Sequence, residues 1–327
     1  MYIFNHSPII WFDEGMNKRQ ALFITATVII VLTVVFSTAF YTQQNNSKSD
    51  KLKVVATFYP LAFFAQQIGG EEVTVRQLIP DNTEVHTWQP SFGDILAIEE
   101  AEVIIYNGAS LDHWFKNDIL PVINISNKVI VKTTTGVKLI ETETHHADEH
   151  EELYDPHTWI SPFIAKQQAQ NIYDALIQKD PDHEAYYSER WQNLKTRFEE
   201  LDNEYLNGLS TKSKEDIFIA HSAFGYLADR YSFKQHGVIG ISADEQPNTQ
   251  VYANLVENMM EYKIYVVYVD PVYTQESVQT LKNELERLSD QEVKILKLYF
   301  MLGTIDNLDY FEQQEKNLEN LKIGLEA

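Results

Sequence analysis

The fold is decided by residues 53–58, KVVATF, a run of β-branched and apolar residues that predicts a buried β-strand. Pro60 ends this strand, and residues 61–68 then carry apolar side chains at helical spacing. Gly69-Gly70 is a typical helix end, and residues 73–79 predict a second strand. A strand, a helix and a strand in succession predict a parallel β-sheet with helices packed against it.

The same alternation continues along the chain. Further strands are predicted at residues 103–106, 129–131, 217–220, 237–241, 264–269 and 293–300, and further helices at residues 93–100, 163–178, 223–231, 249–262, 275–288 and 310–325. Residues 182–209 are one long amphipathic run in the middle of the chain, which we interpret as a connecting helix. We therefore expect an α/β protein of two similar lobes, each a mainly parallel sheet flanked by helices, joined by one long rigid helix.

The expected domain organisation has four parts. Residues 1–50 are an N-terminal membrane anchor or signal segment with a polar tether, and residues 51–180 are the N-terminal lobe. Residues 181–210 are the linking helix, and residues 211–327 are the C-terminal lobe.

The N-terminal segment indicates a location outside the cytoplasm. Residues 21–41 carry no charge, and about 20 apolar residues are enough to span a bilayer. Lys18-Arg19 precede this run, so the positive-inside rule places the rest of the chain on the outer side. We expect an extracytoplasmic protein attached to the cell membrane by an N-terminal helix, or a secreted or periplasmic one if the segment is a cleaved signal peptide. The true start is Met1 or Met16.

Composition excludes several functional classes. The formal net charge is −22 and no run rich in Lys or Arg is present, so nucleic acid is not an expected partner. The chain has no cysteine, which excludes thiol catalysis, disulfides and cysteine metal ligands. Any metal site must therefore use His, Asp and Glu.

Three histidines are candidate metal ligands. His86 follows a predicted strand, His157 lies between Pro156 and a predicted helix, and His221 follows another predicted strand. Ligands of parallel sheets lie beyond the carboxyl ends of the strands, where these loops are expected. Neutral imidazole is a good ligand for Zn²⁺. Spacing alone does not establish that these three residues, far apart in the chain, meet in space.

Several short motifs occur in a characteristic order. They are residues 54–60 (VVATFYP), residues 84–91 (EVHTWQPS), Asn107-Gly108, residues 155–162 (DPHTWISP), residues 221–225 (HSAFG) and Gly240-Ile241-Ser242 with Glu245 and Pro247. With these motifs the chain resembles the metal-binding solute-binding proteins of zinc and manganese ABC importers, over most of residues 53–327. The resemblance implies two lobes joined by a rigid helix, here residues 182–209.

The resemblance also implies a ligand set and a metal. It places metal ligands at His86, His157 and His221, and a histidine at the third position goes with Zn²⁺ rather than Mn²⁺. Three imidazoles also suit Zn²⁺ better than the harder Mn²⁺. Many members supply a fourth, acidic ligand from a loop that lacks an acid at that place here. Glu84 and Asp306 are the candidates for that role, and His145, His146 and His150 form an accessory loop for zinc capture.

The implied function is an extracytoplasmic high-affinity zinc receptor that delivers Zn²⁺ to an ABC permease and its ATPase, without being an enzyme. Its affinity is expected to fall as pH drops through the histidine range. A zinc-dependent hydrolase is one alternative, because catalytic zinc also uses three protein ligands, although no H-E-x-x-H pair is present. A metal-binding surface adhesin is the other alternative, which the sequence does not separate from transport.

Overall fold

The computed structural model describes residues 17–45, 51–142, 154–241, 248–272 and 275–327. The chain divides into two parts, residues 1–51 and residues 52–327. In the first part, α1 (Lys18–Asn45) is a helix. Within the described residues, no helix combines the length and the apolar character needed to cross a membrane. The membrane anchor expected at residues 21–41 stays a prediction.

The second part contains two four-stranded parallel sheets with the same topology. The first sheet has β1 (Leu52–Ala56), β2 (Val73–Gln77), β3 (Val103–Tyr106) and β4 (Val129–Lys132), in the order β2-β1-β3-β4. The second sheet has β5 (Asp216–His221), β6 (Lys234–Ile239), β7 (Val266–Val269) and β8 (Lys294–Lys297), in the order β6-β5-β7-β8. The prediction of an α/β protein with two similar lobes is confirmed.

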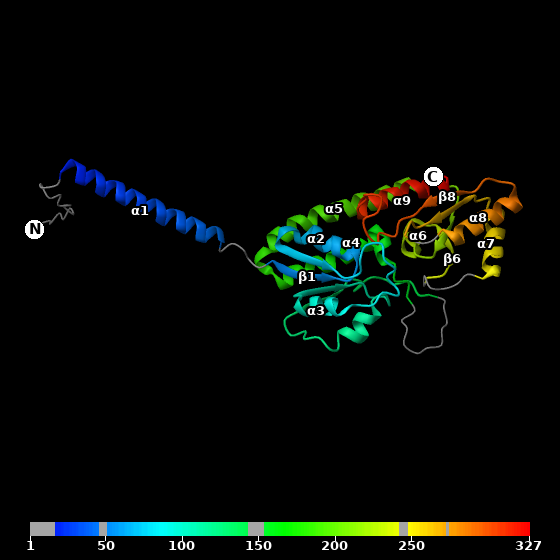
Figure 1. Ribbon diagram of the computed structural model, residues 1–327. Helices are drawn as coiled ribbons and strands as arrows, with labels where there is room; N and C mark the ends of the chain where they lie inside the picture. Colours follow the sequence, from blue (N-terminus) through cyan, green and yellow to red (C-terminus); the bar gives the residue numbers. More distant parts are fainter. Residues whose placement is uncertain (1–16, 46–50, 143–153, 242–247, 273–274) are drawn as a thin grey trace, which may run out of the picture. The chain divides into compact units, whose positions relative to one another are not determined.

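Helices cover both sheets (Figure 1). The first lobe contains α2 (Tyr59–Gly69), η1 (Gly70–Glu72), α3 (Phe92–Glu100), the π-helix η2 (Phe115–Ile119), η3 (Thr158–Ile160) and α4 (Pro162–Lys179), and η4 (Pro181–His183) follows. The long helix is α5 (Glu184–Gly208), and the second lobe contains α6 (Gly225–Tyr231), α7 (Thr249–Tyr262), α8 (Glu276–Ser289) and α9 (Tyr310–Leu325).

The strand side chains alternate between two hydrophobic clusters, as the pleat of a sheet requires. In the first sheet Val54 faces the large central cluster, whereas Val55 faces a smaller cluster against α3 and η2. In the second sheet Ile217 faces the same central cluster, whereas Phe218 faces a separate one against α7 and α8. One continuous core thus runs through both lobes.

The long helix α5 joins the two lobes along this shared core. In its N-terminal half, Trp191 stacks on Tyr173 of α4 with ring centroids 5.9 Å apart. In its C-terminal half, Tyr205 stacks on Tyr231 of α6 at 4.8 Å and donates a hydrogen bond to the Gln314 carbonyl of α9 at 2.7 Å. Figure 1 shows α5 and α9 running side by side, and contacts between these helices agree with that view.

Two predicted strands differ from the structure by three residues at one end. The sixth strand begins at Lys234 instead of residue 237, because β6 is an edge strand whose first residues are polar and incompletely buried. The last strand ends at Lys297 instead of residue 300, because Leu298 and the buried residues after it leave the sheet and pack between the lobes. The domain limits at residues 50, 180 and 210 stay predictions.

We expect Phe198→Ala to destabilise both lobes together. Phe198 is fully buried on α5, with ring centroids 5.3 Å from Phe64 of the first lobe and 5.0 Å from Phe311 of the second. Its removal should lower the free energy of unfolding by about 3–5 kcal/mol. Denaturant unfolding followed by circular dichroism should show one transition, shifted as a whole.

Leu206→Ala is the matched control on the same helix, because Leu206 is 39% exposed and should cost much less. A loss no larger than that of this control, or two separate unfolding transitions, would contradict the shared core.

Candidate metal centre

His86 lies in the loop between β2 and α3, and its side chain is half-buried. The buried neighbour Val85 anchors the loop in the central core. Glu84 Oε1 accepts a hydrogen bond from the His86 backbone N–H at 2.9 Å, which fixes the local turn. The loop therefore presents the His86 ring beyond the carboxyl end of the first sheet.

His157 is buried, with 1% of its surface exposed, and its orientation is set by Asp155. A single carboxylate oxygen, Asp155 Oδ1, accepts hydrogen bonds from the backbone N–H and from Nδ1 of His157, both at 2.9 Å. Because a carboxylate can only accept, Nδ1 carries the proton of the neutral ring and Nε2 keeps its lone pair. This is the tautomer in which Nε2 can bind a metal.

Asn107, directly after β3, holds the residues on both sides of His157. Its Nδ2 donates to the Pro156 carbonyl at 2.9 Å, and its Oδ1 accepts from the Thr158 hydroxyl at 3.0 Å. Gln168 of α4 also donates to Asn107 Oδ1, at 2.8 Å. The Asn107 side chain is fully buried, so these bonds are not exchanged with water and the loop is tightly held.

His221 is the last residue of β5 and comes from the second lobe. Its Nε2 lies 2.7 Å from the Ile241 carbonyl oxygen. Since a carbonyl only accepts, Nε2–H is the donor, and the lone pair of the neutral ring is on Nδ1. The buried strand β5 and this hydrogen bond orient the ring toward the first lobe.

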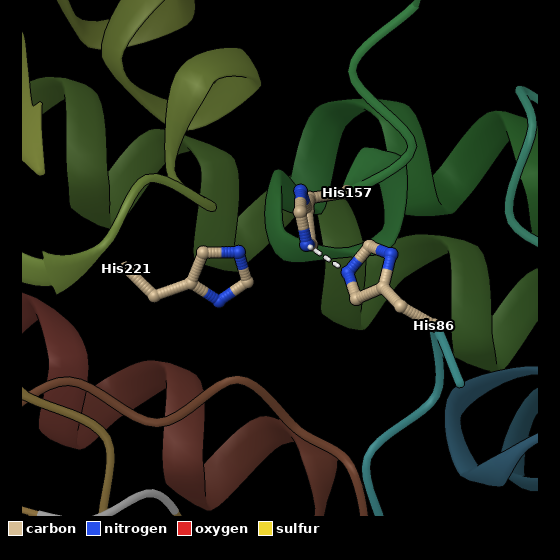
Figure 2. A group of neighbouring side chains, drawn as sticks. All are labelled: His86, His157 and His221. Atoms are coloured by element: carbon tan, nitrogen blue, oxygen red, sulfur yellow. Dashed lines mark hydrogen bonds between the residues drawn. The ribbon is translucent and has the colours of Figure 1, made fainter. Parts of the chain in front are cut away.

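The three rings come together in space (Figure 2). One nitrogen from each of His86, His157 and His221 can be chosen so that all lie within 4.8 Å of one another. The ring centroids are 5.2 Å apart for His86–His157, 5.1 Å for His157–His221 and 5.9 Å for His86–His221. This is the only such group of His, Asp and Glu found among the described residues.

The spacing of the rings suits a tetrahedral ion. Two nitrogens bound to zinc at about 2.0–2.1 Å with tetrahedral angles lie about 3.3 Å apart. The Nε2 atoms of His86 and His157 are 3.2 Å apart, joined by the dashed line in Figure 2. Since the ligand atom of His221 lies within 4.8 Å of the other two, it is at most about 1.5 Å further from them than in a tetrahedral zinc site. A small inward shift of His221 would complete the three-ligand set.

Burial favours the neutral form of His157 and His221 at physiological pH. Burial, followed by the nearby His86 charge, lowers the pKa of His157 well below its usual value. Burial and the His157 charge lower the pKa of His221 to about 3. Burial also raises the pKa of Asp155 to about 7. Nε2 of His157 therefore keeps its lone pair, which faces Nε2 of His86 at 3.2 Å.

Aromatic side chains from both lobes and a buried acid of the second lobe line the site. Trp159 and Phe300 flank His157 and His221 with ring centroids 5.4 Å away in each case. The Trp159 Nε1–H donates to the Phe300 carbonyl at 2.7 Å, across the lobe contact. Asp270, directly after β7, accepts from the Phe300 N–H at 2.6 Å and from the Val272 N–H at 2.7 Å. Burial raises the pKa of Asp270 to about 7.

The two candidates for a fourth ligand lie outside the cluster. Asp306 is exposed, pairs with Lys297 at 2.6 Å and accepts from the Tyr299 hydroxyl at 2.9 Å. Glu84 uses Oε1 for the His86 N–H, and its buried Oε2 has no hydrogen-bond partner among the described residues. Glu84 is therefore held beside His86, whereas Asp306 is held by Lys297 and Tyr299. The accessory residues His145, His146 and His150 lie outside the described residues.

Sequence analysis did not assign roles to Asp155 and Asn107. The signal for Asp155 was its position two residues before His157, a spacing that lets one carboxylate bind both the backbone and the ring. Asn107 had no local signal, because the loop that it holds is about 50 residues further along the chain.

Most of the chain is similar to known zinc-uptake and zinc-binding proteins. The family model described as "Zinc-uptake complex component A periplasmic" matches residues 54–324. The high-affinity zinc uptake system protein ZnuA of Bacillus subtilis is 29% identical over 317 residues, 94% of each chain. The zinc-binding lipoprotein AdcA of Streptococcus pneumoniae is 29% identical over 85% of this chain and 57% of its own.

Solved structures share the fold. The metal-dependent lipoprotein YcdH of Bacillus subtilis matches with a TM-score of 0.72 and 29% identity, covering 85% of this chain and 100% of that one. Zn(II)-bound AdcA of Streptococcus pneumoniae matches with a TM-score of 0.70 and 28% identity, over 85% and 58% of the chains. A laminin-binding protein of Streptococcus agalactiae, described as bifunctional with adhesin and metal-transporting activity, has a TM-score of 0.74 and 25% identity over 84% and 99%. Since the family model matches most of the length of this chain, the chain belongs to the zinc-uptake complex component A family.

Proposed function

We propose that the protein is a zinc receptor that binds one Zn²⁺ between its lobes through His86, His157 and His221 and delivers it to an ABC permease. The observation that carries this proposal is the meeting of three imidazoles, from both lobes, in one buried group. The family membership supports the same reading. Zinc is the cargo of the protein, so the site has to bind it tightly and also let it go.

Zinc fits the ligand set better than manganese. The site offers three imidazole nitrogens, and such donors are typical of zinc sites, whereas Mn²⁺ favours carboxylate and water oxygens. Neither candidate carboxylate belongs to the group of three histidines. Relatives described as a high-affinity zinc uptake protein and as Zn(II)-bound AdcA support zinc.

A carrier fits the site better than a hydrolase does. A hydrolytic zinc needs an open position and a general base next to its water. Glu84, the one base considered, is bonded to the His86 backbone, and an aromatic residue from each lobe packs against the cluster. The ligands also come from two lobes, so a small relative movement would change the affinity, which is useful for release and has no part in hydrolysis.

The partners and location follow from the same reading. We infer an extracytoplasmic protein that works with a membrane permease and a cytoplasmic ATPase. The family description contains the word periplasmic, and the AdcA relative is described as a lipoprotein. The adhesin alternative is supported only by the laminin-binding relative and stays a prediction.

We expect the wild-type protein to bind one tight Zn²⁺ per chain and His157→Ala to lose that binding. Removing a ligand should weaken zinc affinity by more than about 100-fold, since loss of a mere hydrogen-bond support costs about 10–100-fold. Competition titration against a zinc chelator at neutral pH measures the change. His113→Ala is the control, because His113 is exposed and lies outside the cluster. Wild-type affinity in His157→Ala would contradict the assignment of this residue.

We also expect zinc to stabilise the fold. An ion that binds only the native state adds about 4.1 kcal/mol at a free concentration 1,000 times its dissociation constant. The melting temperature should therefore rise with Zn²⁺, fall again when a chelator removes it, and rise much less with equal Mn²⁺. Differential scanning calorimetry tests this. An equal or larger shift with Mn²⁺ would show that the three imidazoles do not determine the metal.

A further inference from the structure

The carboxylate that orients His157 lies at the contact between the lobes. One of its oxygens, Asp155 Oδ1, accepts both hydrogen bonds from His157. The other oxygen, Oδ2, lies against Gly225, the first residue of α6 in the second lobe. A Cβ atom added at Gly225 would overlap Asp155 Oδ2, and would also lie 3.4 Å from Gln235 Nε2. The side chain of Asp155 thus fills the space that a side chain at Gly225 would need.

Space, not backbone conformation, requires glycine at this position. Gly225 is helical, and its φ is not in the positive region. Alanine is a better helix former than glycine, so a helical position of this kind would otherwise favour alanine. Gln235 fixes the start of α6 at this contact, because its Oε1 accepts a hydrogen bond from the Phe224 N–H at 2.7 Å. A substitution at Gly225 therefore acts on the Asp155 carboxylate.

Tyr226, the next residue of α6, holds the backbone of the same loop. Its hydroxyl donates to the Asp155 carbonyl oxygen at 2.7 Å and accepts from the Ile140 N–H at 3.2 Å. The Asp155 N–H in turn donates to the Ile140 carbonyl at 2.9 Å. Tyr226 is buried, so its hydroxyl fixes the start of the loop that carries His157.

We propose that Gly225 and Tyr226 are positioning residues for zinc binding, which act on His157 through Asp155 from the opposite lobe. The inference rests on the proposed zinc function. The second lobe then supports the site twice, because it supplies His221 and also keeps a ligand of the first lobe in its binding orientation. When the second lobe moves away from the first, α6 leaves Asp155 and His221 leaves the ion together. His157 is loosened at the same time, so a small lobe movement is enough to release the ion.

The test compares zinc affinity in Gly225→Ala and Tyr226→Phe with that of the wild-type full chain, by chelator competition. Gly225→Ala should weaken zinc binding by about 10–100-fold, the range for loss of a carboxylate support. Tyr226→Phe should weaken it by about twofold to tenfold, as expected for one lost hydrogen bond.

Two controls match these variants away from the site. Gly93→Ala adds a methyl group to α3, where the nearest other atom is Ser91 Oγ at 3.7 Å. Tyr268→Phe removes a buried hydroxyl that donates to the Asn320 carbonyl at 3.0 Å. Both controls should keep wild-type zinc affinity.

A spectroscopic readout separates positioning from general stability. Imidazole ¹⁵N shifts in the metal-free wild type should show His157 as the Nδ1–H tautomer, and Gly225→Ala should shift it toward a mixture. A purely structural role would lower the melting temperature but leave tautomer and affinity unchanged, and that result overturns the inference. If Gly225→Ala does not fold, unchanged affinity and tautomer in Tyr226→Phe overturn it.

The two proposals fail in different ways. Tight zinc binding by the wild type, its loss in His157→Ala and no loss in Gly225→Ala and Tyr226→Phe would leave the zinc function intact and remove only this inference. Absence of zinc binding by the wild type would remove both.

Discussion

Phe198 packs against Phe64 of the first lobe on one side and Phe311 of the second on the other, in the middle of the helix that joins them. This contact belongs to a single hydrophobic core that includes strands of both sheets. Because close-packed interiors do not deform continuously, the two lobes are held in a narrow range of relative positions. The histidine cluster depends on that range, since it takes ligands from both lobes. A receptor of this kind works with small movements and does not need wide hinge closure.

His157 and His221 can be buried beside one another because neither ring has to carry a charge. The Asp155 carboxylate accepts the ring proton of His157, and the Ile241 carbonyl accepts that of His221. Each acceptor satisfies a buried donor, and Asp155 also leaves the Nε2 lone pair of His157 available to a metal. The lowered pKa values of His157 and His221 are the electrostatic counterpart of this arrangement. In the metal-free site, the Nε2 lone pair of His157 faces Nε2 of His86 at 3.2 Å.

The two lobes use equivalent positions for related purposes. Asn107 directly follows β3 and Asp270 directly follows β7, and these are corresponding strands of sheets with the same order. Each is a buried polar residue that binds the backbone of a loop at the site, Asn107 at Pro156 and Asp270 at Phe300. The loops meet where Trp159 donates to the Phe300 carbonyl. The metal centre thus lies between two similar, separately supported loops.

The sequence by itself determined the α/β alternation, the long helix and the three histidines, because strand and helix periodicity and loop residues are local properties of the chain. It located the strands at residues 53–58 and 217–220 well, since residues 54–56 and 217–220 are apolar and buried on both faces. It misplaced the polar start of the edge strand β6, where burial depends on neighbours. Only the tertiary structure decided that His86, His157 and His221 meet, that Asp306 lies elsewhere with Lys297, and that Asp155 contacts Gly225. These relations join residues up to 135 positions apart in the chain, and packing of the two lobes on one core is what brings them together.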